Sequence, residues 1–209
     1  MAFAVLIVGY YTTGTPYEKD ADILRKNLDA FSIPHDIREV PNLGSWQKNT
    51  QFKSRFIQQM LQEITGPFTY LDVDAEIQSQ PVLLDGLSCD IAAHKFCGHE
   101  LLSGTVFFGN TPKCREVVER WVKLCIEFPD SFPAGFLSYH PKGGRAWDQR
   151  LLCKAIESTP GISFFDLPPE YCYIHDLSKK QYPGVVPVIM HLTASRLYKS
   201  VVNKAGAKR

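Results

Sequence analysis

Two aspartates stand one residue apart in the stretch GPFTYLDVDAEIQSQP, as Asp72 and Asp74. The residues Phe68, Tyr70 and Leu71 before them have the aromatic and aliphatic character of a strand that enters a core. Side chains two residues apart on a strand point to the same side, so we expect both carboxylates to face one site. Because burying carboxylates is costly, the spacing predicts a divalent cation of the kind that also binds phosphate oxygens.

A D-x-D pair is common by chance, and a solvated turn is the competing interpretation. The elements around the pair favour the cation. A helical apolar pattern from Phe52 to Ile64 ends at Gly66-Pro67, directly before the strand that carries the pair. The aspartates therefore follow a strand–helix–strand crossover, and ligands bind at that carboxyl edge of open α/β sheets.

The rest of the chain alternates between strand and helix patterns. An apolar run at residues 2–8 precedes a helical pattern that contains Ile23, Leu24 and Leu28. Strand patterns follow in IPHDIREV, CDIAAHKF, GTVFFGN, ISFFDL and VPVIMHL, and helical patterns in TPKCREVVERWVKLCIEF and WDQRLLCKAIE. Apolar strands that alternate with helices predict an α/β fold with a sheet covered on both faces. No linker-like stretch divides the chain.

Length and composition limit the possible functions. A chain of 209 residues is long enough for one sizeable core, and its net charge of +1 disfavours whole-molecule attraction to polyanions. The longest apolar runs are too short to span a bilayer, and the N-terminal run lacks the features of a signal peptide. Six scattered cysteines without a CxxC pair favour free thiols, so we expect a cytoplasmic protein.

Five stretches together resemble a known family. In chain order they are GPFTYLDVDAEIQSQP, LLSGTVFFGN, AWDQRLLCKAI, LPPEYCYI and VIMHLTASR, and they are similar to the metal-dependent GT-A nucleotide-diphospho-sugar glycosyltransferases. The DQ segment resembles the retaining branch of that family. The resemblance implies a single GT-A (Rossmann-like) domain at residues 1–200, with a mixed, mostly parallel central sheet flanked by helices. Residues 201–209 would form a basic C-terminal tail.

The resemblance implies a metal site made of Asp72, Asp74 and His191. His191 ends the apolar run VVPVIM and matches the family's late histidine; a histidine bonded within the core is the alternative for this residue alone. An imidazole beside two carboxylates suits Mn²⁺ better than Mg²⁺, which prefers oxygen ligands, so Mn²⁺ is the expected cofactor and Mg²⁺ the second choice. The sequence LTASRLYK replaces the Gly-Lys-Pro-Trp continuation of some retaining members, which leaves the subfamily and the donor open.

The same resemblance makes Asp148 and Gln149, in AWDQRLL, the catalytic residues, in contact with the donor sugar near its anomeric carbon. An aspartate at this place could instead cap the helix that begins there. Ser103 and Gly104 would let the sugar approach the backbone closely, with a simple turn as the alternative for the glycine.

Residues from several elements are expected to bind the nucleotide sugar. The stretch GYYTTG would hold the nucleobase, with stacking by Tyr10 or Tyr11. Lys53 and Asn49 lie where a basic residue of the family meets the diphosphate, although the solvated face of a helix is the commoner place for a lysine. The complete expected set is Gly9, Tyr10, Tyr11, Thr12, Asn49, Lys53, Asp72, Val73, Ser103, Gly104, Trp147, Arg196 and Lys199.

Cations and tryptophans extend this set. No acidic residue follows Asp176, and Arg196 and Lys199 are the cations nearest His191, so they could neutralise the diphosphate. The basic tail also leaves nucleic acid open as a partner. Trp46 and Trp147 could be sugar platforms, although tryptophans are more often partial core residues.

We therefore expect a hexosyltransferase-type glycosyltransferase that moves a sugar from a nucleotide sugar, a UDP-sugar, to a hydroxyl acceptor with retention of configuration. A glycan, a lipid, a protein and a modified DNA base of the phage type all stay open as acceptors. A sugar nucleotidyltransferase is one alternative, but GYYTTGTPYEK is a poor match to its Gly-rich phosphate loop. A non-catalytic nucleotide-sugar-binding module is the other, and the intact set of expected metal ligands speaks against it.

Overall fold

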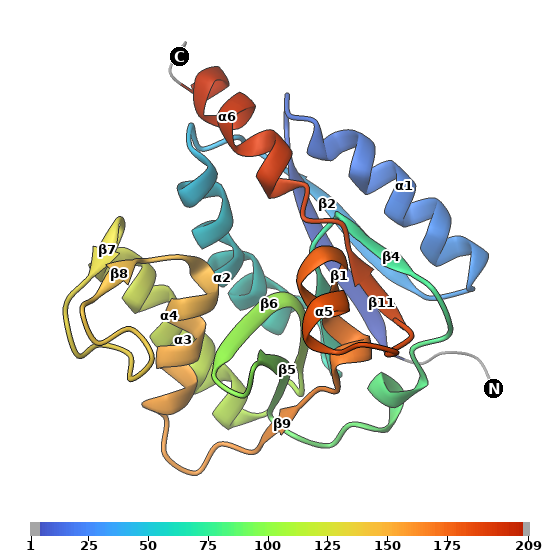
Figure 1. The fold of residues 1–209 in the computed structure, drawn as a ribbon. Coiled ribbons are helices and arrows are strands. Elements are labelled where there is room, and N and C mark those ends of the chain that lie inside the picture. The colour runs from blue at the N-terminus through green and yellow to red at the C-terminus, as the bar shows by residue number, and fades with distance from the viewer. Residues whose placement is uncertain (1–4, 207–209) are drawn as a thin grey trace.

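Six strands form the central sheet of the computed structural model, which describes residues 5–206, in the order β2-β1-β3-β6-β5-β9 (Figure 1). β6 runs antiparallel to both of its neighbours, and the other pairs in this sheet are parallel. The expectation of a mixed, mostly parallel sheet is therefore confirmed. The strands are β1 (Leu6–Thr12), β2 (His35–Val40), β3 (Phe68–Leu71), β5 (Ile91–Phe96), β6 (Glu100–Phe108) and β9 (Phe164–Asp166).

Helices cover both faces of this sheet, as the apolar strands predict. On one face, α2 (Trp46–Glu63), α3 (Pro112–Glu127) and α4 (Asp148–Glu157) enclose the larger part of the core, and α1 (Tyr17–Ala30) lies on the other (Figure 1). Neighbouring strand residues alternate between the two, so that Ile7 packs with the α1 side and Val8 with the α2 side. Because α2 and α4 pack on the same face of the sheet, this packing holds the first residues of both helices in place relative to the strands.

Gly9 of β1 shows how closely the strands pack. A Cβ at this position would lie 2.8 Å from the backbone oxygen of Leu71 in β3. We expect Gly9→Ala to lower the free energy of unfolding by about 1–3 kcal/mol, because neither backbone can move without disturbing the sheet. Chemical denaturation measures the effect. Gly66→Ala is the matched control, since nothing lies within 4 Å of its Cβ position, and an equal loss there would contradict this explanation.

A second, smaller sheet has the order β10-β11-β4, with β4 (Ala75–Ile77), β10 (Tyr173–Ile174) and β11 (Ile189–His191). The chain leaves the central sheet after β3, turns at residues 72–74 and enters β4. β4 pairs antiparallel with β11, and His191 lies opposite Ala75. The strand expected in VPVIMHL is therefore short and belongs to this second sheet, and its register brings His191 beside the D-x-D turn.

Two helices near the C-terminus, α5 (His175–Gln181) and α6 (Ser195–Gly206), lie over the carboxyl edge of the central sheet (Figure 1). The expected division between the domain and its tail, at residues 200 and 201, falls inside α6, and residues 207–209 lie outside the described residues. The remaining short elements are β7 (Ser131–Phe132), β8 (Gly144–Arg145) and the 3-10 turns η1 (Val82–Gly86) and η2 (Pro169–Cys172). Among the described residues, no helix is both long and apolar enough to cross a membrane.

Candidate active site

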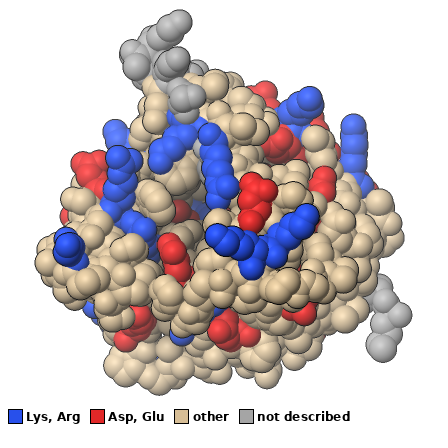
Figure 2. Space-filling view, viewed as in Figure 1, with Lys and Arg blue, Asp and Glu red and all other residues tan. Residues whose placement is uncertain are grey.

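A cavity of about 510 Å³ opens at the carboxyl edge of the central sheet. Figure 2 shows its mouth as a hollow with Lys and Arg side chains around it. All but one of the expected site residues line it; Gly9 does not, and the close approach of β3 accounts for that glycine. The expected residues on its wall are Tyr10, Tyr11, Thr12, Asn49, Lys53, Asp72, Val73, Asp74, Ser103, Gly104, Trp147, Asp148, Gln149, His191, Arg196 and Lys199.

The D-x-D pair lies in a turn and not on a strand. β3 ends at Leu71, and the N–H of Ala75 donates a hydrogen bond to the backbone oxygen of Asp72 over 3.0 Å. The expectation that strand periodicity aligns the two carboxylates is therefore wrong. The turn aligns them instead: Asp72, Asp74 and His191 each offer a ligand atom, and these atoms all lie within 4.8 Å of one another.

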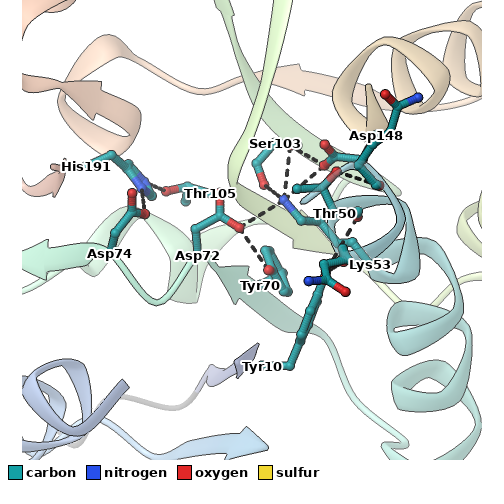
Figure 3. Close-up of polar contacts among 12 residues, drawn as sticks. Tyr10, Thr50, Lys53, Tyr70, Asp72, Asp74, Ser103, Thr105, Asp148 and His191 are labelled. Atoms are coloured by element: carbon teal, nitrogen blue, oxygen red, sulfur yellow. Dashed lines mark hydrogen bonds and ion pairs between the residues drawn. The ribbon is translucent and has the colours of Figure 1, made fainter. Parts of the chain in front are cut away.

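His191 is oriented as a metal ligand would be. Its Nε2 lies 2.9 Å from the hydroxyl oxygen of Thr105, while its Nδ1 faces the Asp74 carboxylate at 3.7 Å (Figure 3). A partner on one ring nitrogen that leaves the other free for the ion is the usual arrangement of a metal-bound histidine. Gly104 makes room for the ring, because a Cβ there would lie 2.8 Å from Cε1 of His191. The residues present fit a small divalent cation.

Charges at this cluster favour an ion pair when no cation is bound. Burial alone would lower the pKa of His191, but its contacts with Cys172 and Asp74 raise that pKa to about 10. Burial likewise opposes the charge of Asp74, yet the His191 imidazolium and the N–H of Ala194, which donates to it over 2.8 Å, keep the pKa of Asp74 below its usual value. A metal ion would therefore have to displace a proton from His191.

We expect the affinity for Mn²⁺ to rise with pH between pH 6 and 8, by up to about tenfold per pH unit. The sign follows from the raised pKa, because His191 holds a proton throughout this range and a higher pH removes that competitor. Titration of Mn²⁺ followed by electron paramagnetic resonance, without nucleotide, measures the slope. His191→Gln should bind Mn²⁺ more weakly and lose most of the slope; a slope that persists in this variant would contradict the assignment.

Lys53 lies on the cavity wall between Asp72 of the D-x-D turn and Asp148 at the start of α4. Lys53 is only 3% exposed, so the interpretation that it lies on a solvated helix face is wrong. Its ammonium lies 2.9 Å from Asp72, 3.0 Å from Asp148 and 3.1 Å from both the hydroxyl and the backbone oxygen of Ser103 (Figure 3). Although burial opposes the charge, Asp148 and Asp72 raise the pKa of Lys53 above its usual value. Lys53 thus joins the D-x-D turn to the start of α4.

Asp148 is the first residue of α4, and Trp147 occupies the N-cap position, so the interpretation of Asp148 as a cap is wrong. Its buried carboxylate accepts hydrogen bonds from Lys53 and, over 2.7 Å, from the Ser103 hydroxyl. Gln149 follows it, and its amide donates to the Glu100 carboxylate over 3.1 Å. Both side chains therefore lie at the cavity in fixed positions.

The two tyrosines at the end of β1 differ in their exposure to solvent. Tyr10 is buried in the core, and its hydroxyl donates to the backbone oxygen of Asn49 over 2.6 Å. Tyr11 is half-exposed, with the Arg25 guanidinium 5.2 Å from its ring centroid and a hydrogen bond of 3.2 Å to Glu39. Of the two, only Tyr11 keeps an accessible ring surface for stacking.

The structure also brings to the cavity residues that the sequence did not single out. Tyr70 donates to Asp72 over 2.9 Å; its spacing of two from Asp72 was the available signal. Glu100 of β6 also lines the cavity. The other additional lining residues are Tyr17, Thr50, Phe96, Leu102, Cys172, Ile174, Leu177 and Thr193, and Trp46, named above as a possible sugar platform, lines the cavity as well.

No protein-family model and no curated protein sequence matches the chain, but solved structures do. A glycosyltransferase involved in the glycosylation of the major capsid of PBCV-1 superposes with a TM-score of 0.63 at 13% identity, over 99% of this chain and 100% of its own. GlyE of Streptococcus pneumoniae TIGR4, a glycosyltransferase, gives 0.61 at 14% identity, over 90% of this chain and 54% of GlyE.

The galactosyltransferase LgtC, solved in complex with donor and acceptor sugar analogues, gives a TM-score of 0.58 at 9% identity, over 98% of this chain and 96% of its own. At identities this low, the superpositions establish the fold but not the activity. The order of the strands, the D-x-D turn at the carboxyl edge of the sheet and these superpositions all indicate the same fold. The chain therefore has the fold of the GT-A glycosyltransferases.

Proposed function

We propose that the chain is a metal-dependent glycosyltransferase that moves a sugar from a UDP-sugar to a hydroxyl acceptor. One observation carries the proposal: the cluster of Asp72, Asp74 and His191 and the start of α4 with Asp148 and Gln149 line a single cavity. A cation site at one end and hydrogen-bonding side chains farther along suit a diphosphate joined to a sugar.

Asp72, Asp74 and His191 would hold the cation, for which Mn²⁺ suits the mixed ligand set and Mg²⁺ is the second choice. When bound, it would stabilise the charge that develops on the departing diphosphate. Arg196 and Lys199 line the same cavity and add positive charge there. Tyr11 supplies the ring surface for the nucleobase.

Asp148 and Gln149 would act on the donor sugar. Lys53 and Ser103 hold the Asp148 carboxylate on the cavity wall, where it can accept hydrogen bonds from sugar hydroxyls. We assign Gln149 to the neighbourhood of the anomeric carbon, with the sugar transferred with retention. Inversion would need a carboxylate base in the cavity, and Glu100 is the residue that could serve, so Glu100→Gln is the variant that separates the two outcomes.

The compartment and the acceptor class complete the proposal. The six scattered cysteines favour a reducing compartment such as the cytosol. A glycan or a modified DNA base would each offer a hydroxyl acceptor.

Release of UDP from a panel of UDP-sugars, with water as the acceptor, tests the proposal. We expect release from one donor, with Mn²⁺ and not with a chelator, and we expect Glu100→Gln to retain it. Formation of UTP from UDP-sugar and pyrophosphate would instead identify a sugar nucleotidyltransferase. Binding of UDP-sugars without turnover of any would identify a non-catalytic module.

A further inference from the structure

Two indole rings stand at the cavity, on the starts of different helices. Trp46 begins α2, and Trp147 directly precedes α4. Their ring centroids are 6.3 Å apart and their planes meet at 89°. Both residues line the cavity, and the enclosed Nε1 of Trp147 has no hydrogen-bond partner among the described residues. This pair therefore differs from Trp121, which is fully buried and whose Nε1 donates to the backbone oxygen of Asp148 over 3.0 Å.

A lysine of α6 covers these rings. The Lys199 ammonium lies 4.1 Å from the ring centroid of Trp46 and 5.7 Å from that of Trp147. Partial burial and the neighbouring Arg145 lower the pKa of Lys199, so the cation gains little from its place. A cation over a partly exposed ring is a weak contact, and a ligand with an apolar face can replace it.

The orientation of α6 indicates that a ligand can displace Lys199 from the indole rings. The helix turns charged Lys199 toward the indoles, while Leu197 is 73% exposed and Val201 is 48% exposed. A helix that served only to seal the rings from water would place its apolar side chains on them. The face of Trp46 is thus covered by a group that water can solvate readily, whereas the Arg150 guanidinium lies 4.2 Å from the ring centroid of Trp147.

We propose that the acceptor is a saccharide whose pyranose ring stacks on the face of Trp46 and borders the ring of Trp147, in the place that Lys199 occupies in the free protein. The proposal rests on the glycosyltransferase function. A pyranose has an apolar C–H face that suits an indole, and its edge carries hydroxyls. Gln149 and Glu100 line the same cavity and can bind those hydroxyls.

Saturation-transfer NMR with the methyl pyranosides of glucose, galactose, mannose and N-acetylglucosamine tests this site. The full chain is used with saturating UDP and Mn²⁺, and again without them. We expect at least one pyranoside to receive saturation, most strongly on the protons of one ring face. Trp147→Leu and Trp46→Leu should each weaken binding about three- to tenfold, the effect of losing one aromatic contact, and Trp147→Phe should lose less. Lys199→Ala should strengthen binding without UDP.

Phe165→Leu is the matched control, because Phe165 is a partly exposed aromatic residue that does not line this cavity. Binding that is unchanged in both tryptophan variants, or absent for every pyranoside, would overturn the proposal. So would a signal that Asp148→Asn abolishes, since the sugar would then lie in the donor position. Thermal stabilisation by UDP and Mn²⁺ on the same samples separates the two proposals: its presence without pyranoside binding refutes the acceptor site alone, and its absence refutes the donor function.

Discussion

Replacing Lys53 with methionine is expected to lower the free energy of unfolding by about 3–5 kcal/mol, the cost of leaving the buried Asp148 carboxylate without its partner. The ammonium is the shared partner of Asp72, Asp148 and the backbone oxygen of Ser103. Methionine has a similar volume, so the loss would report charge and hydrogen bonding more than packing. Urea denaturation followed by circular dichroism measures it.

Lys113→Met is the control for this prediction. Lys113 also contacts a carboxylate, that of Glu116 at 2.8 Å, but its side chain is 44% exposed. Ion pairs at such places contribute about 0–1 kcal/mol. If Lys53→Met lowers the free energy of unfolding by less than about 1 kcal/mol, as the control does, Lys53 does not hold the D-x-D turn and the start of α4 together.

Asp148→Asn is expected to lower the rate of UDP release about a hundredfold to a thousandfold, the effect of removing one charged contact to a reacting group. Asparagine keeps the shape of the side chain and loses its charge. Because Asp148 is not one of the three clustered ligands, binding of UDP with Mn²⁺ should weaken far less than turnover. The turnover rate and the UDP affinity, measured together, would distinguish this outcome from a general disruption of the site.

Lys154→Gln, on the same helix and outside the cavity lining, is the companion control and should retain full turnover. Turnover of Asp148→Asn within about threefold of the unmodified protein would contradict contact with the donor sugar, because a charged contact contributes more than that.

The sequence predicted α1 to α4 and the longer strands of the central sheet because their apolar patterns extend over many residues, but it did not predict α5 and α6. It did not predict β4 and β10, since strands of two or three residues have too little pattern. The second sheet was missed for this reason, and with it the register that opposes His191 to Ala75. The metal cluster was nonetheless predicted, from the order of motifs that resemble the GT-A glycosyltransferases.

Individual roles were harder to predict than membership of the site. Lys53 was expected at the diphosphate and lines the cavity, and its ammonium also contacts Asp72 and Asp148, of which Asp148 is distant from it in sequence. Gly9 was expected at the nucleobase, but the backbone of Leu71 accounts for it. In each case the structure adds a contact between distant parts of the chain, and no local pattern records such a contact.

Thermal unfolding of the protein with UDP, in the presence and absence of Mn²⁺, tests the central claim most directly when Asp74→Ala is measured beside it. UDP at 100 times its Kd should stabilise the unmodified protein by about 2.7 kcal/mol, only with Mn²⁺, and Asp74→Ala should abolish the effect. Asp22→Ala, at a side chain that is 68% exposed, should retain it. Stabilisation by UDP that is independent of both Mn²⁺ and Asp74 would contradict a metal-dependent nucleotide-sugar site at the D-x-D turn.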